Sequence, residues 1–100
     1  MINIRLEISP YFADVLHVKG SEWINIEKDL KQWATIGDIL VDLANNNVDF
    51  RKLVFNPLSR ELTDEVMIAL NGSLLQLSNL LEVKLKDGDH VMILPMVKEG

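Results

Sequence analysis

The residues with the clearest chemical potential lie at the end of the sequence, in the short tail of residues 95–100. The tail follows a hydrophobic strand predicted at Val91–Leu94 and ends on Lys98-Glu99-Gly100. Two charged residues and a glycine suit an end that is presented to another molecule better than one that is packed into a core. The chemistry would be that of a reactive carboxylate on Gly100, and the alternative is an ordinary frayed end.

The other polar residues do not form a set with the spacing of a catalytic or metal site. His17 and His90 are far apart in the sequence, and each is expected to be a surface residue or a satisfied strand residue. Asp87 and Asp89 stand beside His90, but a polar turn explains them better than a metal site. Asp64-Glu65 is likewise expected to be a turn rather than an acid–base pair. The absence of cysteine excludes a thiolate nucleophile and a cysteine-ligated metal.

The composition narrows the classes of partner. One hundred residues, 48% of them hydrophobic and 25% charged, correspond to one globular domain. A net charge of −5 disfavours binding to nucleic acid and to anionic lipid, and leaves a protein partner open. No apolar run approaches the roughly 20 residues that a membrane span needs. The N-terminus opens directly into an alternating strand, not a signal peptide, so we expect a cytoplasmic protein.

The first half of the sequence predicts two strands and one helix. Residues 2–9 alternate between apolar and polar side chains, which indicates a half-buried strand. Residues 22–27 alternate again and predict a second strand, and residues 28–33 are expected to form an irregular excursion. A helix begins after Thr35, whose capping-box partner is Asp38, and ends at the asparagines 45–47 in a left-handed cap. Its apolar face is predicted to hold Ile36, Ile39, Leu40, Leu43 and Ala44.

The second half begins with a long connection and then predicts three strands. Residues 48–64 lack a sustained period and are expected to hold at most one short helical turn. A central strand at Val66–Leu70, a turn at Asn71-Gly72 and a short return strand at residues 73–76 follow. A turn at residues 86–89 leads into the last strand. Trp23 and Trp33 are expected to be core or half-buried residues, with one exposed at an interface as the alternative.

This order of elements predicts an α+β fold of the β-grasp type. We expect a mixed sheet of four to five strands that packs on one main helix, with the first and last strands side by side in the middle. The predicted organisation is a β-grasp domain of residues 1–94 and an exposed C-terminal tail of residues 95–100.

Four motifs occur in the order found in the ubiquitin-like sulfur carriers. The helix entry ATIGDIL of residues 34–40, the run VMIALNG of residues 66–72 and the turn LKDGD of residues 85–89 are similar to that family. The segment Leu94-Pro95-Met96-Val97 resembles the tail of the molybdopterin synthase small subunit. The chain therefore resembles the sulfur-carrier family over nearly its whole length, closest to the molybdopterin branch rather than the thiamine branch.

The resemblance implies a protein cosubstrate or small subunit rather than an independent enzyme. In this family an activating enzyme uses ATP to adenylate the C-terminal carboxylate, which becomes a thiocarboxylate and donates sulfur. The implied partners are that adenylating enzyme and a larger molybdopterin synthase catalytic subunit, and no stably bound cofactor is implied. Gly100 matches the family's final glycine. The residues implied in tail docking are Leu94, Pro95, Met96, Val97 and Glu99.

The sequence departs from the family at Glu99, where the penultimate glycine of a Gly-Gly end is expected. A glutamate adds bulk in a narrow channel and a negative charge beside a carboxylate that must react with a triphosphate. Two hypotheses follow: an active carrier whose partner has a roomier channel, or a non-catalytic β-grasp interaction module that has lost activation. Seven extended residues, Leu94 to Gly100, could reach about 23 Å, enough to enter a partner's active site.

Overall fold

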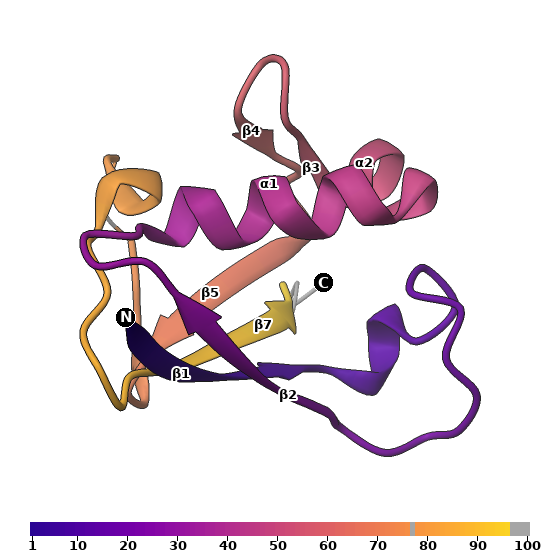
Figure 1. Cartoon of the computed structure of the whole chain (residues 1–100). Helices are drawn as coiled ribbons and strands as arrows, with labels where there is room; N and C mark the ends of the chain where they lie inside the picture. The colour runs from indigo at the N-terminus through magenta and orange to yellow at the C-terminus, as the bar shows by residue number, and fades with distance from the viewer. Residues whose placement is uncertain (77, 97–100) are drawn as a thin grey trace.

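The computed structural model describes residues 1–76 and 78–96, and its main feature is a five-stranded sheet covered on one face by a helix (Figure 1). The strand order is β2-β1-β7-β5-β6. The strands of this sheet are β1 (Ile2–Ile8), β2 (Ile24–Leu30), β5 (Val66–Leu70), β6 (Ser73–Leu74) and β7 (His90–Pro95).

The sheet is mixed, as predicted. The first and last strands, β1 and β7, lie side by side and parallel, with Arg5 opposite His90 and Ile8 opposite Ile93. β2 pairs antiparallel to β1, and β5 pairs antiparallel to β7 on the other side. The predicted α+β fold of the β-grasp type is therefore confirmed. β5 is an interior strand, as predicted, paired with β7 on one side and β6 on the other.

The main helix, α1 (Ile36–Asn46), begins where the capping box predicts. The Thr35 hydroxyl accepts from the Asp38 N–H at 3.2 Å, and the Asp38 carboxylate accepts from the Thr35 N–H at 2.9 Å. The prediction of a left-handed cap at the other end is wrong, because Asn47 has an extended backbone with a φ of −142°. Its side-chain amide donates instead to the Leu43 carbonyl at 3.1 Å and satisfies that end of the helix.

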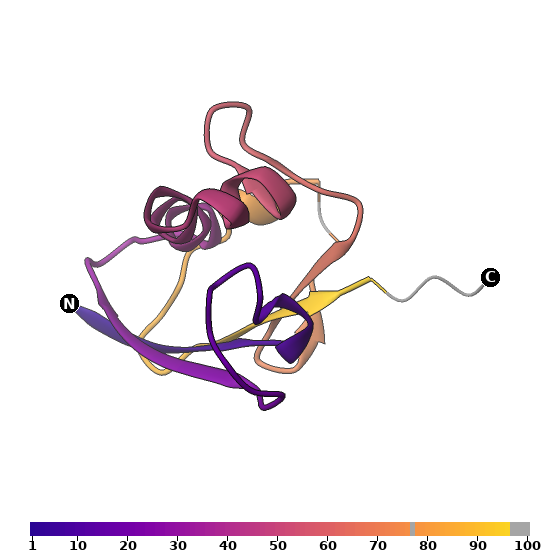
Figure 2. The same cartoon turned by 90° about the vertical axis from the view of Figure 1, so that its right-hand side faces the viewer.

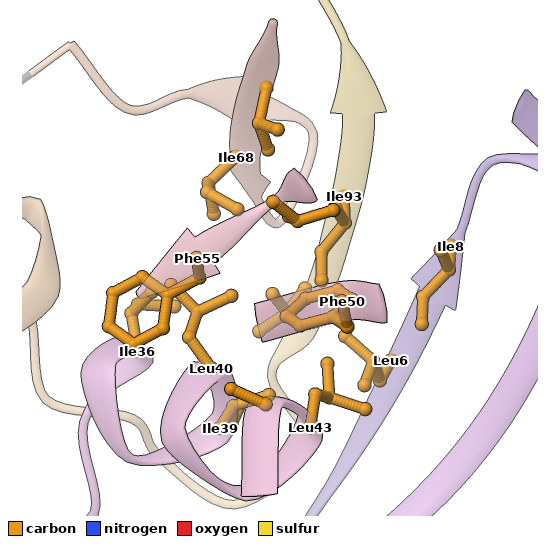
Figure 3. Packing of buried hydrophobic residues seen from close by; sticks show 14 of the residues in the cluster. Leu6, Ile8, Ile36, Ile39, Leu40, Leu43, Phe50, Phe55, Ile68 and Ile93 are labelled. Atoms are coloured by element: carbon orange, nitrogen blue, oxygen red, sulfur yellow. The ribbon is translucent and has the colours of Figure 1, made fainter. Parts of the chain in front are cut away.

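The core lies between α1 and the inner face of the sheet (Figure 3). The predicted apolar stripe of the helix is buried in full. It packs against the inward side chains of β1, β5 and β7, which include Leu6, Ile68 and Ile93. Side chains at successive positions of a strand point to opposite faces, so the residues between these inward side chains lie on the face away from α1.

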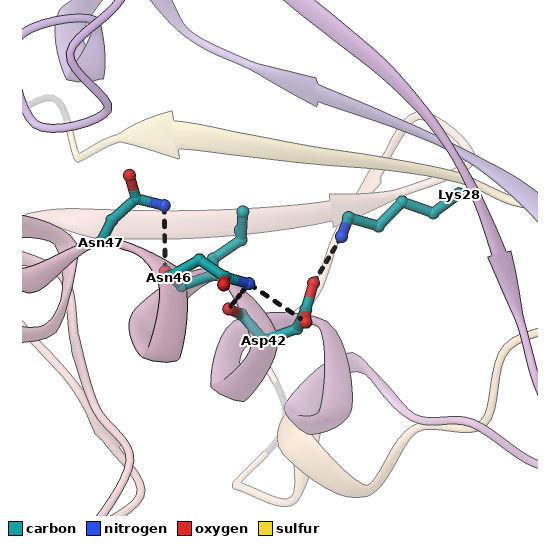
Figure 4. A network of polar contacts seen from close by, with 5 residues as sticks. Lys28, Asp42, Asn46 and Asn47 are labelled. Atoms are coloured by element: carbon teal, nitrogen blue, oxygen red, sulfur yellow. Dashed lines mark hydrogen bonds and ion pairs between the residues drawn. The ribbon is translucent and has the colours of Figure 1, made fainter.

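β2 is longer than the sequence predicted, because residues 28–30 continue the strand instead of leaving it. Lys28 pairs with Ile4 in the inward-facing register, a position where the alternation rule expects an apolar residue. Its stem lies over the edge of the core, and its ammonium group forms an ion pair with Asp42 on α1 (Figure 4). A lysine can therefore occupy an inward position at the sheet edge.

The connection of residues 48–64 contains more structure than predicted. It forms a short helix, α2 (Val48–Leu53), and a two-stranded hairpin of β3 (Phe55–Asn56) and β4 (Glu61–Leu62). Phe50 and Phe55 are fully buried against α1, so the connection closes one end of the core. Two 3-10 helices complete the fold, η1 (Pro10–Phe12) and η2 (Leu80–Glu82).

Both tryptophans lie further from the core than predicted. Trp33 is 68% exposed and has a φ of 76°, and Trp23 is 42% exposed. The Trp33 ring is covered on one face by Lys84, whose Nζ lies 5.4 Å from the ring centroid. The buried residue at this point of the chain is Ala34, which directly follows Trp33.

Two turns match the sequence prediction closely. Asn71 and Gly72 have φ values of 51° and 86°, as a two-residue hairpin loop with two left-handed positions requires. In the turn before β7, Gly88 also has a positive φ of 86°, and the Asp89 carboxylate accepts from the Lys86 N–H.

Within the described residues, no helix is both long and apolar enough to cross a membrane.

Candidate functional site

The candidate site is the end of β7, where the chain leaves the sheet toward its C-terminus. Pro95 lies opposite Val66 of β5, and the Met96 N–H donates to the Glu65 carbonyl at 2.7 Å. The strand therefore includes Pro95, one residue beyond the predicted end at Leu94, and the chain is held to its neighbour as far as Met96. Figure 2 shows β7 running toward the end of the molecule opposite Met1.

Pro95 is compatible with a strand because of what lies beside it. The Ser9 N–H donates to the Ile93 carbonyl at 3.0 Å, and the chain then turns away from β7 into η1. The Ser9 carbonyl accepts from the Phe12 N–H at 3.0 Å and is therefore already satisfied. A residue that lacks an N–H consequently costs no ladder hydrogen bond at position 95.

The outer face of the sheet is apolar along the strands that lead to this exit. Leu94 lies opposite Met67, and Met92 lies opposite Ala69, which in turn lies opposite Leu74 of β6. Cross-strand partners share a face, and this face is the one opposite α1 because Val91 and Ile93 point into the core. We call Met67, Ala69, Leu74, Met92 and Leu94 the outer patch.

The other half of the outer face is polar and mostly acidic. On β1 and β2, Arg5 lies opposite Glu27, and the Asn3 amide donates to the Asp29 carboxylate at 2.9 Å. His90 Nε2 lies 3.0 Å from Glu7 Oε1 at the border between the two halves. A surface that covers this face would therefore need an apolar region beside a basic one.

The sequence-predicted site residues fall into two groups. Leu94, Pro95 and Met96 lie together at the exit, with Leu94 on the outer patch. Val97, Glu99 and Gly100 lie outside the described residues, so their proposed roles stay predictions. The division into a domain of residues 1–94 and a tail of residues 95–100 also stays a prediction.

The remaining candidates have structural partners of the expected kind. His17 Nε2 lies 3.1 Å from an Asp49 carboxylate oxygen at the surface. The Asp87 carboxylate accepts from the Asn3 N–H at 2.7 Å, as a polar turn predicts. Among residues 1–76 and 78–96, no cluster of His, Asp or Glu side chains could hold a metal ion.

Sequence reasoning missed the part of the site that β5 contributes. Met67 and Glu65 flank the exit only because β5 runs antiparallel beside β7. The available signal was the alternation within Val66–Leu70, where Met67 points away from the buried Val66 and Ile68. That signal was hard to recognise because Val66–Leu70 carries apolar residues on both faces of the strand.

The comparisons with known proteins agree with this geometry. The sequence profile of the ThiS family matches residues 11–98. The chain belongs to the ThiS family. It is thus a member of the ubiquitin-like sulfur carriers, as its motifs predict. No curated protein matches the sequence significantly.

Several solved structures share the fold of this ThiS-family chain. SAMP1 from Haloferax volcanii is 22% identical with a TM-score of 0.71, over 98% of this chain and 99% of that one. A Pyrococcus furiosus protein described as molybdopterin converting factor subunit 1 is 21% identical with a TM-score of 0.69, over 97% and 100%. CysO in the Amycolatopsis orientalis BexX/CysO complex is 21% identical with a TM-score of 0.67, over 97% and 99%.

Proposed function

We propose that this ThiS-family protein carries sulfur as a C-terminal thiocarboxylate on Gly100 and delivers it in molybdopterin synthesis. It would act as a cosubstrate or small subunit, without turnover of its own. The observation that supports the proposal is how far the sheet holds the last strand. The sheet holds β7 as far as Met96, and four further residues lead to the terminal glycine.

The proposed chemistry has two steps, both performed by a partner. The Gly100 carboxylate oxygen attacks the α-phosphorus of ATP, so that pyrophosphate leaves and an acyl adenylate forms. Hydrosulfide from a sulfur donor then attacks the acyl carbon, AMP leaves, one proton is released, and the carbon retains a C–S bond as a thiocarboxylate. The described residues contain no candidate metal site, and this chain contributes the carboxylate and its presentation. ATP is used by the activating partner, which fits action in the cytoplasm.

Two features support binding to an adenylating enzyme and then to a larger synthase subunit. The outer patch offers an apolar surface that continues from the exit along β7, β5 and β6. The structural relative CysO occurs in a complex with BexX, a precedent for a protein partner on this fold. The Leu94-Pro95 tail supports the molybdopterin branch, and a protein described as molybdopterin converting factor subunit 1 is among those that share the fold.

The direct test is mass spectrometry of the chain after incubation with an adenylating enzyme, ATP and a sulfur donor. We expect a mass increase equal to the replacement of one oxygen by sulfur, located on the C-terminal peptide. The matched control is the chain without Gly100, which should show no increase. An unmodified full-length chain beside a modified control carrier would contradict the proposal.

Glu99 favours a second candidate, a non-catalytic β-grasp interaction module. Its charge and bulk oppose activation on a triphosphate, and the outer patch could serve binding alone. A pull-down with the full chain and with a chain that lacks Val97–Gly100 separates the two functions. Equal recovery of the same partner by both chains, without any thiocarboxylate, would favour the module.

A further inference from the structure

The outer patch continues into a groove at the edge of β5, and Met67 and Leu74 belong to both. The groove has a volume of about 490 Å³ and lies between the end of β4, the first residues of β5 and the segment that follows β6. Its apolar lining includes Leu62, Val66, Leu75, Leu80 and Met96. Met96 is 43% exposed and forms the wall of the groove at the tail exit.

The polar residues that line the groove give it a negative charge. Asp64 is exposed at its rim beside Thr63 and Gln76, and none of the lysines and arginines among residues 1–76 and 78–96 lines it. Asp64 also borders a more open hollow that contains Arg51 and Lys52, but the described residues show no ion pair between them and Asp64. The groove therefore fits an apolar segment that carries a positive charge.

The length of the tail determines which partner can cover the groove. Because Met96 is hydrogen bonded to Glu65, only residues 97–100 can reach away from the sheet. Four extended residues span at most about 14 Å. A protein that acts on the Gly100 carboxylate must consequently approach the surface around Met96, and the groove is part of that surface.

We propose that the groove receives an apolar segment of the adenylating enzyme, with a lysine or arginine that pairs with Asp64. This inference rests on the proposed function, since the partner is the enzyme that activates Gly100. The groove would add selectivity for that enzyme through the charge of Asp64, which the outer patch lacks. It would lower the KM for the carrier and leave the rate of the chemical step unchanged.

The test is a steady-state assay of pyrophosphate release by an adenylating enzyme, with the carrier as the varied substrate. We expect Asp64→Lys to raise the KM by roughly tenfold, since reversal of a paired charge weakens association, and to leave kcat unchanged. Gln76→Trp, which fills the groove, should act in the same direction. Asp64→Glu keeps the charge and should behave as the wild type. Glu22→Lys makes the same change of net charge in an exposed loop that does not line the groove and serves as the control.

The outcomes separate this inference from the proposed function. If the Asp64→Lys variant has the KM of the wild type, the proposed role of the groove is overturned and the proposed function is unaffected. If the wild-type chain binds the enzyme in calorimetry but is not adenylated, the proposed function fails. Weaker binding of Asp64→Lys in that experiment would still support the groove. No binding by the wild-type chain would overturn both.

Two further outcomes concern other occupants of the groove. If deletion of Val97–Gly100 shifts the NMR methyl signals of Leu62 and Leu80 in the absence of enzyme, the chain's own tail fills the groove. If sedimentation shows a dimer that Asp64→Lys dissociates, a second copy fills it. Either result overturns the assignment to the adenylating enzyme.

Discussion

Glu99 has the largest expected effect on the proposed reaction, because it stands next to the carboxylate that must approach a triphosphate. Glu99→Gly removes one negative charge and the side chain, and restores the Gly-Gly end of the family. We expect kcat/KM for adenylation to rise by at least about tenfold, which corresponds to about 1.4 kcal/mol of transition-state stabilisation. Pyrophosphate release at limiting carrier concentration measures this change.

Lys98→Gly is the matched control for that substitution. It introduces a glycine one residue earlier in the tail and leaves Glu99 in place. Adenylation should not improve in this variant. An equal gain in both variants would mean that tail flexibility, rather than the glutamate, limits activation.

Gly37 is the glycine whose replacement is predicted to disturb the fold most directly. A Cβ at this position would lie 2.5 Å from Arg60 Nη2 and 2.9 Å from the Leu81 carbonyl oxygen. The arginine tip can move away, but the carbonyl belongs to the backbone of η2. We expect Gly37→Ala to lower the free energy of unfolding by about 1–3 kcal/mol, as overpacking commonly does. Urea denaturation gives the value.

Asn45→Ala, at an exposed position of the same helix, is the control for Gly37→Ala. It should change the free energy of unfolding by no more than about 0.5 kcal/mol. Removal of the arginine tip in Gly37→Ala/Arg60→Ala should restore little stability, since the Leu81 contact remains. Full recovery in the double variant would show that the arginine alone causes the strain.

The capping box fixes where α1 begins, and thereby where the apolar stripe of the helix meets the sheet. Thr35→Ala removes the hydroxyl that accepts from the Asp38 N–H. The expected loss is about 1 kcal/mol in the free energy of unfolding. Thr35→Ser retains the hydroxyl and should lose less, so a similar loss in both variants would assign the effect to the methyl group.

The Lys28–Asp42 ion pair joins β2 to α1 at the edge of the sheet (Figure 4). The Asp42 side chain is 49% exposed, so solvent screens the pair. A double-mutant cycle with Lys28→Met and Asp42→Asn should give a coupling energy below about 1 kcal/mol. The coupling should shrink in 1 M salt, where the Debye length is about 3 Å. A larger, salt-independent coupling would indicate a desolvated pair.

The elements that the sequence predicted best are those whose signal is local. The alternation of residues 2–8 and the Thr35–Asp38 capping box each specify an element without help from the rest of the fold. The hairpin of β3 and β4 has two residues in each strand, which is too short for a periodic pattern. The end of β2 was not predicted for a different reason. Lys28 occupies an inward position there, and its charge is paired with the Asp42 carboxylate of α1, which the local sequence does not reveal.

The sequence predicted the site residues that are consecutive in the chain, but not those that a neighbouring strand contributes. Leu94, Pro95 and Met96 follow one another in the sequence, and a motif can identify them. Glu65 and the outer patch residue Met67 join the site only through the pairing of β5 with β7. Pairing between strands more than twenty residues apart depends on the whole fold, and no local pattern encodes it.

The molecule as a whole is arranged so that its last strand lies in the middle of the sheet. β7 is bonded to β1 and β5, so neither of its edges is free along most of its length. The chain is therefore held to the sheet as far as Met96, and the reach of residues 97–100 is about 14 Å rather than the 23 Å predicted for residues 94–100. A partner must approach closely and cover the surface around the exit.

Two truncations test where the folded domain ends. A chain that ends at Met96 keeps the pairing of Pro95 with Val66 and the hydrogen bond to Glu65, so we expect its free energy of unfolding to equal that of the full chain. A chain that ends at Leu94 loses both, and should be less stable by about 1–2 kcal/mol, given the net value of one hydrogen bond and the exposed apolar surface. Urea denaturation of the three chains gives these differences. Equal stability of all three would place the boundary at Leu94. The longer reach would then be available to the tail, and the partner would no longer be forced onto the groove beside Met96.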